Sequence, residues 1–102
     1  MSRRAFIAGF ALAALTTTAA AAQDTVKIGL ILPMTGPFAS TGRQIEAAAK
    51  LYMAEKGATV AGKKIELIVK DDASAADTTK RIAQEMVTND KVAVLAGFGL
   101  TP

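Results

Sequence analysis

The sequence contains no cysteine, no histidine and no tryptophan among its 102 residues. Without cysteine, disulfides and thiolate metal sites are excluded. Without histidine, the most usual general base and a common metal ligand are missing as well. Few residues remain for catalysis, so the sequence predicts a protein that is not an enzyme and that uses no cofactor and no metal.

The net charge is also close to zero when residues 1–22 are left out of the count. Residues 1–22 begin with Arg3 and Arg4, continue through an apolar segment and end in small residues. This order is the layout of a secretory signal peptide, and we predict cleavage after Ala22, with Ala21 as the alternative. Lys and Arg exceed Asp and Glu by 12 to 9, so losing both arginines lowers the net charge from +3 to +1. Nucleic-acid binding is therefore not expected.

The first segment has one structural alternative and two export routes. A membrane anchor needs roughly 20 strongly apolar residues, whereas this segment is rich in alanine and threonine. Ser2-Arg3-Arg4-Ala5-Phe6-Ile7 resembles the twin-arginine export signal, and it suits the Sec route equally well. A lipid-anchored exported protein needs a cysteine at the cleavage site. The sequence therefore predicts a soluble periplasmic protein.

Two helical patterns separate three apolar runs in the remaining residues. The runs at 25–32, 64–70 and 92–96 predict strands, and the first is apolar enough for the centre of a parallel sheet. A helix is expected over 42–56 and ends at Gly57. A second helix is expected to follow a capping box of Ser74 and Asp77 and to end near 89–90.

Apolar spacing predicts which face of each helix is buried. Ile45, Ala48, Ala49 and Tyr52 share one face of the first helix. A second set has core spacing in the second helix and comprises Thr79, Ile82, Ala83 and Met86.

The order β-α-β-α-β predicts the start of a doubly wound α/β lobe with a parallel sheet. Three strands and two helices leave apolar faces uncovered. Residues 23–102 are therefore expected to be the N-terminal part of a first ligand-binding lobe, with the second lobe absent. We also expect this segment not to fold stably alone.

Two loops at the ends of predicted strands are candidates for ligand binding. Residues 33–42 and 97–102 are rich in glycine and hydroxyl side chains, and ligands of open α/β sheets bind at such strand ends. Backbone N–H groups at helix starts suit a carboxylate or phosphate. Ser40, Thr41 and Thr101 add hydroxyl donors, and Phe38 and Phe98 offer an apolar wall.

Other interpretations of these residues stay open. The loop residues also suit turns by their backbone geometry alone. Neither loop has the dinucleotide-binding fingerprint or a P-loop. Asp71-Asp72 is the only pair of adjacent carboxylates, but neighbours on an extended chain point to opposite faces. Ending the strand and capping the helix explain the pair better than a metal or an acid–base couple.

Several of these segments together resemble a known family. They are Ile28-Gly29 leading to Pro33-Met34-Thr35-Gly36-Pro37, Lys64-Ile65-Glu66-Leu67 leading to Asp71-Asp72-Ala73, and Val92 to Gly97 with a Thr-Pro loop. In order and spacing they resemble the periplasmic solute-binding proteins of branched-chain amino acid ABC transporters. The likeness extends over residues 25–102.

The resemblance implies a type I periplasmic binding protein, whose two lobes close on a ligand without chemistry. The implied ligand is a branched-chain or other amino acid, an amide or a small aromatic carboxylate. The implied partner is an inner-membrane ABC permease. Thr101 matches the hydroxyl residue at the strand end that contacts the ligand in this family. Thr41 matches a pocket position that carries a bulky aromatic in some relatives. The candidate ligand-binding residues are Thr101, Thr41, Leu100, Phe98 and Ser40.

Two other functions are compatible with the same pattern. A ligand-sensing domain of a signalling receptor uses the same lobes and would be followed by a membrane span or an output domain. An exported α/β hydrolase or reductase needs a nucleophile elbow, a histidine or a cofactor fingerprint. None of these three features occurs in the sequence.

Overall fold

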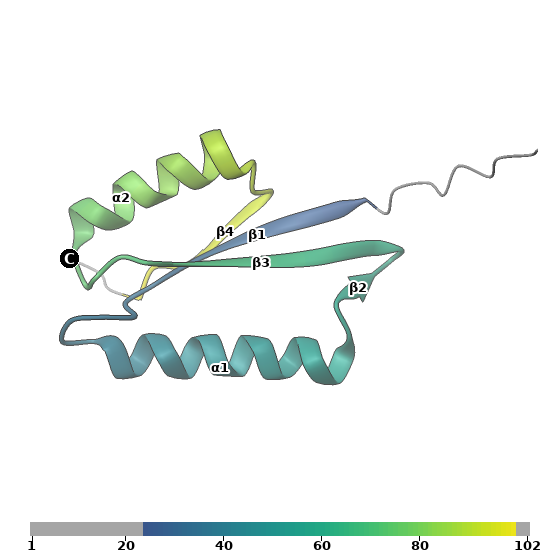
Figure 1. Ribbon diagram of the computed structural model, residues 1–102, viewed down its shortest axis with the longest axis horizontal. Coiled ribbons are helices and arrows are strands. Elements are labelled where there is room, and N and C mark those ends of the chain that lie inside the picture. Colours follow the sequence, from purple (N-terminus) through teal and green to yellow (C-terminus); the bar gives the residue numbers. More distant parts are fainter. Residues whose placement is uncertain (1–23, 100–102) are drawn as a thin grey trace, which may run out of the picture.

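In the computed structural model, residues 24–99 form a four-stranded sheet with one helix on each face (Figure 1). The predicted leader at 1–22 and two candidate site residues, Leu100 and Thr101, lie outside the described residues. Between Asp24 and Gly99, no helix combines the length and apolarity that crossing a membrane requires.

Strand β1 (Thr25–Leu32) is the centre of the sheet, as predicted. It pairs in parallel with β3 (Lys63–Asp71) on one side and with β4 (Val94–Gly97) on the other. Leu30, Ile31 and Leu32 are all buried. Because successive side chains of a strand point to opposite faces, this burial requires cover on both faces of the sheet.

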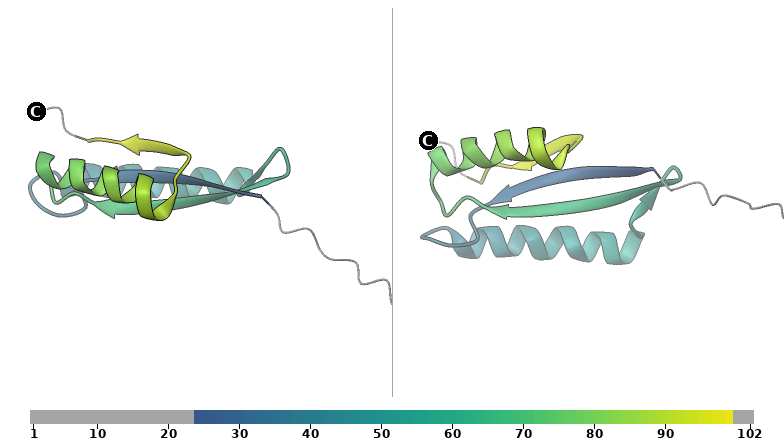
Figure 2. Two further views of the ribbon diagram at one scale, coloured as in Figure 1. Left: turned by 90° about the horizontal axis from the view of Figure 1, so that it is seen from above. Right: turned by 45° about the horizontal axis from the view of Figure 1, so that its top comes forward.

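Helices α1 (Ala39–Lys56) and α2 (Ala76–Glu85) supply that cover. The chain runs from β1 through α1 to β3, then back across β1 through α2 to β4. Reversing the direction while keeping right-handed crossovers places the two helices on opposite faces. Figure 2 shows α2 in front of the sheet and α1 behind it. The doubly wound α/β prediction is confirmed.

The tightest core lies between the sheet and α2. Ile31, Ile82 and Met86 form its buried centre, and Ile68 and Leu95 pack against them. Met86 also occupies the space beside Gly29, where a Cβ atom would lie 2.8 Å from the Met86 sulfur. The predicted burial of Ile82 and Met86 is therefore confirmed.

Helix α1 differs from the prediction in its start and in how deeply its predicted face is buried. It begins at Ala39 rather than at residue 42. Ile45 and Tyr52 keep 38% and 65% of their surface exposed, so their predicted burial is wrong. Gly42 is buried instead, because a Cβ atom there would collide with the carbonyl oxygen of Pro33. That close approach fixes which side of the helix meets the sheet.

A two-residue strand, β2 (Thr59–Val60), lies between α1 and β3, where no strand was predicted. It pairs antiparallel with the start of β3, with Val60 opposite Lys63. The connecting residues Ala61 and Gly62 both have positive φ, at 51° and 77°. Such a pair makes the two-residue hairpin turn that matches the twist of the strands. Alanine does not favour this conformation, so the hairpin is hard to predict from these residues.

The second helix ends in a π-helical turn, η1 (Met86–Asp90), followed by Lys91 with a φ of 57°. The helix thus ends where the sequence predicts. The Lys70 ammonium lies 2.8 Å from a carboxylate oxygen of Glu85 and 2.8 Å from one of Asp90. Both bonds raise the pKa of Lys70 above its ordinary value, and the bond with Asp90 is the larger cause. Lys70 therefore links β3 to α2 through Glu85 and to η1 through Asp90.

We expect Ile82→Ala to destabilise the protein by about 2–4 kcal/mol, because it removes buried atoms and leaves a cavity. Ile82 is 4% exposed. Val87→Ala is the matched control, since Val87 lies nearby in the sequence but is 51% exposed, and its cost should stay below about 1 kcal/mol. Urea denaturation of both variants measures the difference. Equal losses would contradict the assignment of the core.

Candidate functional site

The carboxyl ends of β1, β3 and β4 lie at one edge of the sheet, together with the N-termini of α1 and α2 (Figure 1). β1 pairs with β3 on one side and with β4 on the other. The first crossover goes from β1 to β3, and the second returns past β1 to β4. The direction in which strands are added to the sheet therefore reverses between β1 and β4. Ligands of open α/β sheets bind at such a switch point, which makes this edge the candidate site.

Pro33 joins the two loops that border this point. It is fully buried directly after β1. Gly42 of α1 packs against its carbonyl group, and a Cβ atom at Gly99 would lie 2.9 Å from its ring. Gly97, with a φ of 101°, leaves no room for a side chain beside the Ile31 carbonyl. These glycines therefore let both loops close on the end of β1.

Three of the five predicted site residues lie at this edge. Ser40 and Thr41 are exposed in the first turn of α1, where backbone N–H groups give a partial positive charge. The Thr41 N–H donates to the Phe38 carbonyl at 3.1 Å. Phe98 is 45% exposed directly after β4. Leu100 and Thr101 lie outside the described residues, so their part in the site stays a prediction.

Phe98 has an unusual backbone conformation. Its φ is 58°, a left-handed conformation that costs a residue with a side chain roughly 1–2 kcal/mol. Its N–H donates to the Ile31 carbonyl at 3.0 Å, which holds the turn against β1. Such strain concentrates at ligand-binding sites, and here it occurs at a residue that the sequence singled out.

Asp71 connects the loop after β1 with the turn after β3. Its Oδ1 accepts hydrogen bonds from the N–H groups of Met34 at 2.8 Å, Thr35 at 3.2 Å and Ala73 at 2.8 Å. Its Oδ2 accepts the Thr35 hydroxyl at 2.7 Å. The sequence analysis missed this role, because the pairing of Leu32 with Asp71 becomes apparent only once the strands are aligned.

These donors lower the pKa of Asp71. The hydrogen bond from the Thr35 hydroxyl is the largest cause, and the N–H groups of Ala73, Met34 and Thr35 act in the same direction. Burial opposes them by raising the pKa. Because each bond favours the charged form of an acceptor, the carboxylate stays ionised under neutral conditions.

Asp72 points the other way, as expected for neighbours on a strand. It is 1% exposed, and its oxygens accept the Ser74 N–H at 3.0 Å and the Thr79 hydroxyl at 2.8 Å. The pair ends β3 as predicted, since Asp71 is the last residue of the strand. Its predicted capping of the helix is wrong, because α2 has no side-chain cap bond and Asp72 accepts the side-chain hydroxyl of Thr79 instead. In the described ranges, no cluster of potential ligands for a metal ion occurs.

The predicted capping box is wrong. The cap of α2 is Ala75 and makes no side-chain cap bond, and Ser74 has a φ of 60°. The Ser74 hydroxyl donates instead to the Thr35 carbonyl at 2.9 Å. Asp72 engages the start of the helix through Thr79, so the serine side chain is available to the neighbouring loop. Asp77 lies in the first helical turn, where its charge favours the helix dipole.

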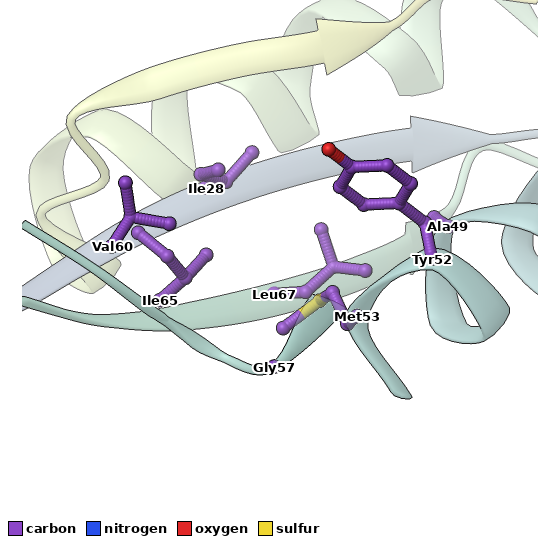
Figure 3. A pocket seen from close by; sticks show the side chains of 8 residues that line it. All are labelled: Ile28, Ala49, Tyr52, Met53, Gly57, Val60, Ile65 and Leu67. Atoms are coloured by element: carbon purple, nitrogen blue, oxygen red, sulfur yellow. The ribbon is translucent and has the colours of Figure 1, made fainter. Parts of the chain in front are cut away.

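A hollow lies toward the other end of the sheet, between α1 and the strands (Figure 3). It has a volume of about 430 Å³ and lies between Tyr52 and Met53 of the helix and apolar side chains of the sheet, among them Ile28, Ile65 and Leu67. None of the predicted ligand-binding residues lines it. This hollow is therefore separate from the candidate site.

The sequence and the structure match one family throughout. The model of the periplasmic binding protein family matches residues 25–101. A relative named Leu/Ile/Val-binding protein homolog 6, from Brucella abortus, is 42% identical over 98 residues, which are 94% of this chain and 25% of the relative. The chain thus spans about a quarter of the length of this curated relative.

Two solved structures are similar to the described part. A solute-binding protein of an ABC transporter from Rhodopseudomonas palustris, in complex with 3,4-dihydroxybenzoic acid, is 65% identical with a TM-score of 0.77 and covers 78% of this chain and 22% of its own. The branched-chain amino acid transporter substrate-binding protein LivJ from Streptococcus pneumoniae, in complex with isoleucine, is 29% identical with a TM-score of 0.67. The match covers 72% of this chain and 22% of LivJ.

We expect acid to weaken the fold partly through Asp71. Its pKa is below the ordinary 3.8 in the folded protein. Its bonds therefore stabilise the fold above that pH, and their contribution is lost as the pH falls through the lower folded pKa. Asp71→Asn should reduce the free energy of unfolding at neutral pH and flatten its decline below about pH 4.

Urea denaturation at a series of pH values measures this decline. Glu66→Gln is the control, since Glu66 is exposed on the same strand and should leave the wild-type pH dependence in place. Parallel curves for the wild type and Asp71→Asn would contradict the prediction.

Proposed function

Because this chain belongs to the periplasmic binding protein family, we propose that the protein captures a small aromatic carboxylate and delivers it to an inner-membrane ABC permease. The family and the similar structures consist of binding proteins rather than enzymes. The protein therefore binds its solute without converting it.

The choice of ligand rests on one observation. The protein that is 65% identical to this chain is in complex with 3,4-dihydroxybenzoic acid, whereas the one in complex with isoleucine is 29% identical. The compared segment covers 22% of that protein, and where it borders the ligand a closely similar sequence presents similar groups. A hydroxylated benzoate is therefore favoured over a branched-chain amino acid.

The candidate site suits this ligand class. The N-terminal turn of α1 offers N–H groups and the hydroxyls of Ser40 and Thr41 to a carboxylate. Phe38 and Phe98 are about half exposed at the same edge, and aromatic rings pack well against a benzoate ring. In this proposal, Leu100 lines the apolar wall and the Thr101 hydroxyl donates to the ligand.

An aliphatic amino acid is the second candidate ligand. It is favoured by the name of the relative that is 42% identical to this chain, a Leu/Ile/Val-binding protein homologue. An amino acid has a carboxylate like a benzoate, so the same helix start would serve it. The two candidates differ in the ammonium group, which an amino acid needs to pair with an acceptor.

A periplasmic location is implied by the family. In our proposal, residues 1–22 are the export leader and residue 23 begins the mature protein, released by the Sec or the twin-arginine route. The rest of the first lobe and a second lobe would complete the binding site, as the length of the relatives indicates.

We expect the full-length protein to bind 3,4-dihydroxybenzoate and 4-hydroxybenzoate. At a ligand concentration 100 times the Kd, binding stabilises a protein by about 2.7 kcal/mol, which a thermal-shift assay detects as a higher Tm. 3,4-Dihydroxybenzyl alcohol is the matched control, because it lacks only the carboxylate, and it should leave the Tm unchanged. A shift with leucine or isoleucine and none with the benzoates would replace this ligand class with amino acids.

We expect Thr101→Ala to weaken benzoate binding by roughly 10- to 100-fold, because a hydrogen bond to a charged group contributes about 1.5–3 kcal/mol. Calorimetric titration measures the loss. Thr59→Ala in β2 is the control, since Thr59 is exposed in the hairpin and should bind like the wild type. Unchanged affinity of Thr101→Ala would remove Thr101 from the site while leaving the ligand class in place.

A further inference from the structure

The loop between β1 and α1 depends on contacts with the turn after β3. The loop residues 35–38 are exposed. One internal bond, from the Ala39 N–H to the Gly36 carbonyl at 3.2 Å, closes the loop toward the helix. At its other end, Met34 and Thr35 are held by Asp71, and Ser74 bonds to Thr35. Both contacts come from outside the loop.

Gly36 shows how closely the loop and the turn pack. Its φ is 82°, and a Cβ atom there would lie 2.9 Å from the Ser74 hydroxyl oxygen and 3.0 Å from the Ala73 carbonyl oxygen. No side chain larger than hydrogen can occupy this position without moving one of the two segments. The loop is therefore fixed by shape as well as by hydrogen bonds.

The held loop leads directly into the proposed ligand-binding turn. The Phe38 carbonyl accepts the N–H groups of Thr41 at 3.1 Å and Gly42 at 3.3 Å, so the end of the loop and the first turn of α1 move together. A displacement at Thr35 would be passed on through Gly36 to the hydroxyls of Ser40 and Thr41.

We propose that Asp71 is a positioning residue, whose carboxylate holds the loop after β1 so that the start of α1 is in its binding geometry before the ligand arrives. This inference rests on the proposed function of that turn. Asp71 acts through Met34 and Thr35 and needs no contact with the ligand. It thereby lowers the cost of ordering the loop on binding.

The chemistry of the contact calls for a carboxylate. All four groups around Asp71 are donors: three N–H groups share Oδ1, and one hydroxyl meets Oδ2. A carboxylate is a pure acceptor on both oxygens, whereas an asparagine replaces one oxygen with an N–H donor. Asp71→Asn keeps the size of the side chain and loses both the charge and one acceptor.

The first experiment measures 3,4-dihydroxybenzoate binding by calorimetric titration of the full-length protein, with the amino acids as alternative probes. Asp71→Asn should weaken the affinity on the order of tenfold. Thr79→Val is the control, because Thr79 bonds to Asp72 from α2 and its loss destabilises the same turn without touching the loop. Its affinity should equal that of the wild type at a temperature where both variants are folded.

The second experiment measures hydrogen exchange at the Met34 and Thr35 amides without ligand. Both N–H groups donate to Asp71, so Asp71→Asn should speed their exchange while the amides of β1 keep their protection. Thr35→Val should weaken binding as well. Combined with Asp71→Asn it should cost less than the two separate losses together, because both changes break the same bond.

Wild-type affinity in Asp71→Asn, or an equal loss of affinity in Thr79→Val, would overturn the positioning role. If the wild type bound neither benzoates nor amino acids, the proposed function would fail. The exchange experiment alone would then test whether Asp71 holds the loop. Unchanged exchange at Met34 and Thr35 in Asp71→Asn would overturn the inference whatever the ligand.

Discussion

Strand β1 carries apolar side chains on both faces, and this requirement for double burial organises the molecule. Leu30 and Leu32 alternate with Ile31 and are all buried, so the strand needs a neighbour on each side and a helix above and below. Parallel pairing with β3 and β4 meets the first need. Opposite placement of α1 and α2 meets the second (Figure 1). The edge that results brings two helix starts beside three strand ends.

The end of β1 then decides how close the surrounding segments come. Pro33 is buried and has no N–H to donate, and Gly42, Gly97 and Gly99 pack around the end of the strand. The loop after β1 therefore cannot continue the sheet and instead meets the carboxylate of Asp71 from the neighbouring strand. Packing at one proline and hydrogen bonding at one aspartate together define the shape of the candidate site.

Much of this arrangement is predictable from local patterns. The apolar run 25–32 marks the central strand, and Ile82 and Met86 mark the core face of α2, because both signals depend only on the order of apolar residues. Ser40, Thr41 and Phe98 could be assigned to the same edge, since strand ends and helix starts coincide in a parallel sheet. Leu100 and Thr101 follow the same reasoning and lie beyond the described residues.

Features that depend on contacts between distant segments escaped prediction. Helix α1 approaches the end of β1 closely at Gly42 but leaves a hollow between Tyr52 and the strands, so Tyr52 is exposed although its spacing predicts a buried position. The Ser74 hydroxyl bonds to the Thr35 carbonyl rather than capping α2, because the cap position of the helix is held by Ala75. Asp71 is visible in the sequence as a strand end, but its four donors come together only through the alignment of β3 with β1.

The short hairpin has a consequence for how the sheet meets other chains. β2 pairs with Lys63 and Lys64 of β3, and the Ile65 N–H donates to the Ala58 carbonyl at 2.7 Å. Among the described residues, the strand beyond Ile65 has a pairing partner on one side alone. An uncovered strand edge is a template for adding a foreign strand. Glu66 is exposed on this stretch, and an added strand would have to bring a matching charge or bury the carboxylate unpaired. The charge of Glu66 thus opposes the addition of a foreign strand at this edge.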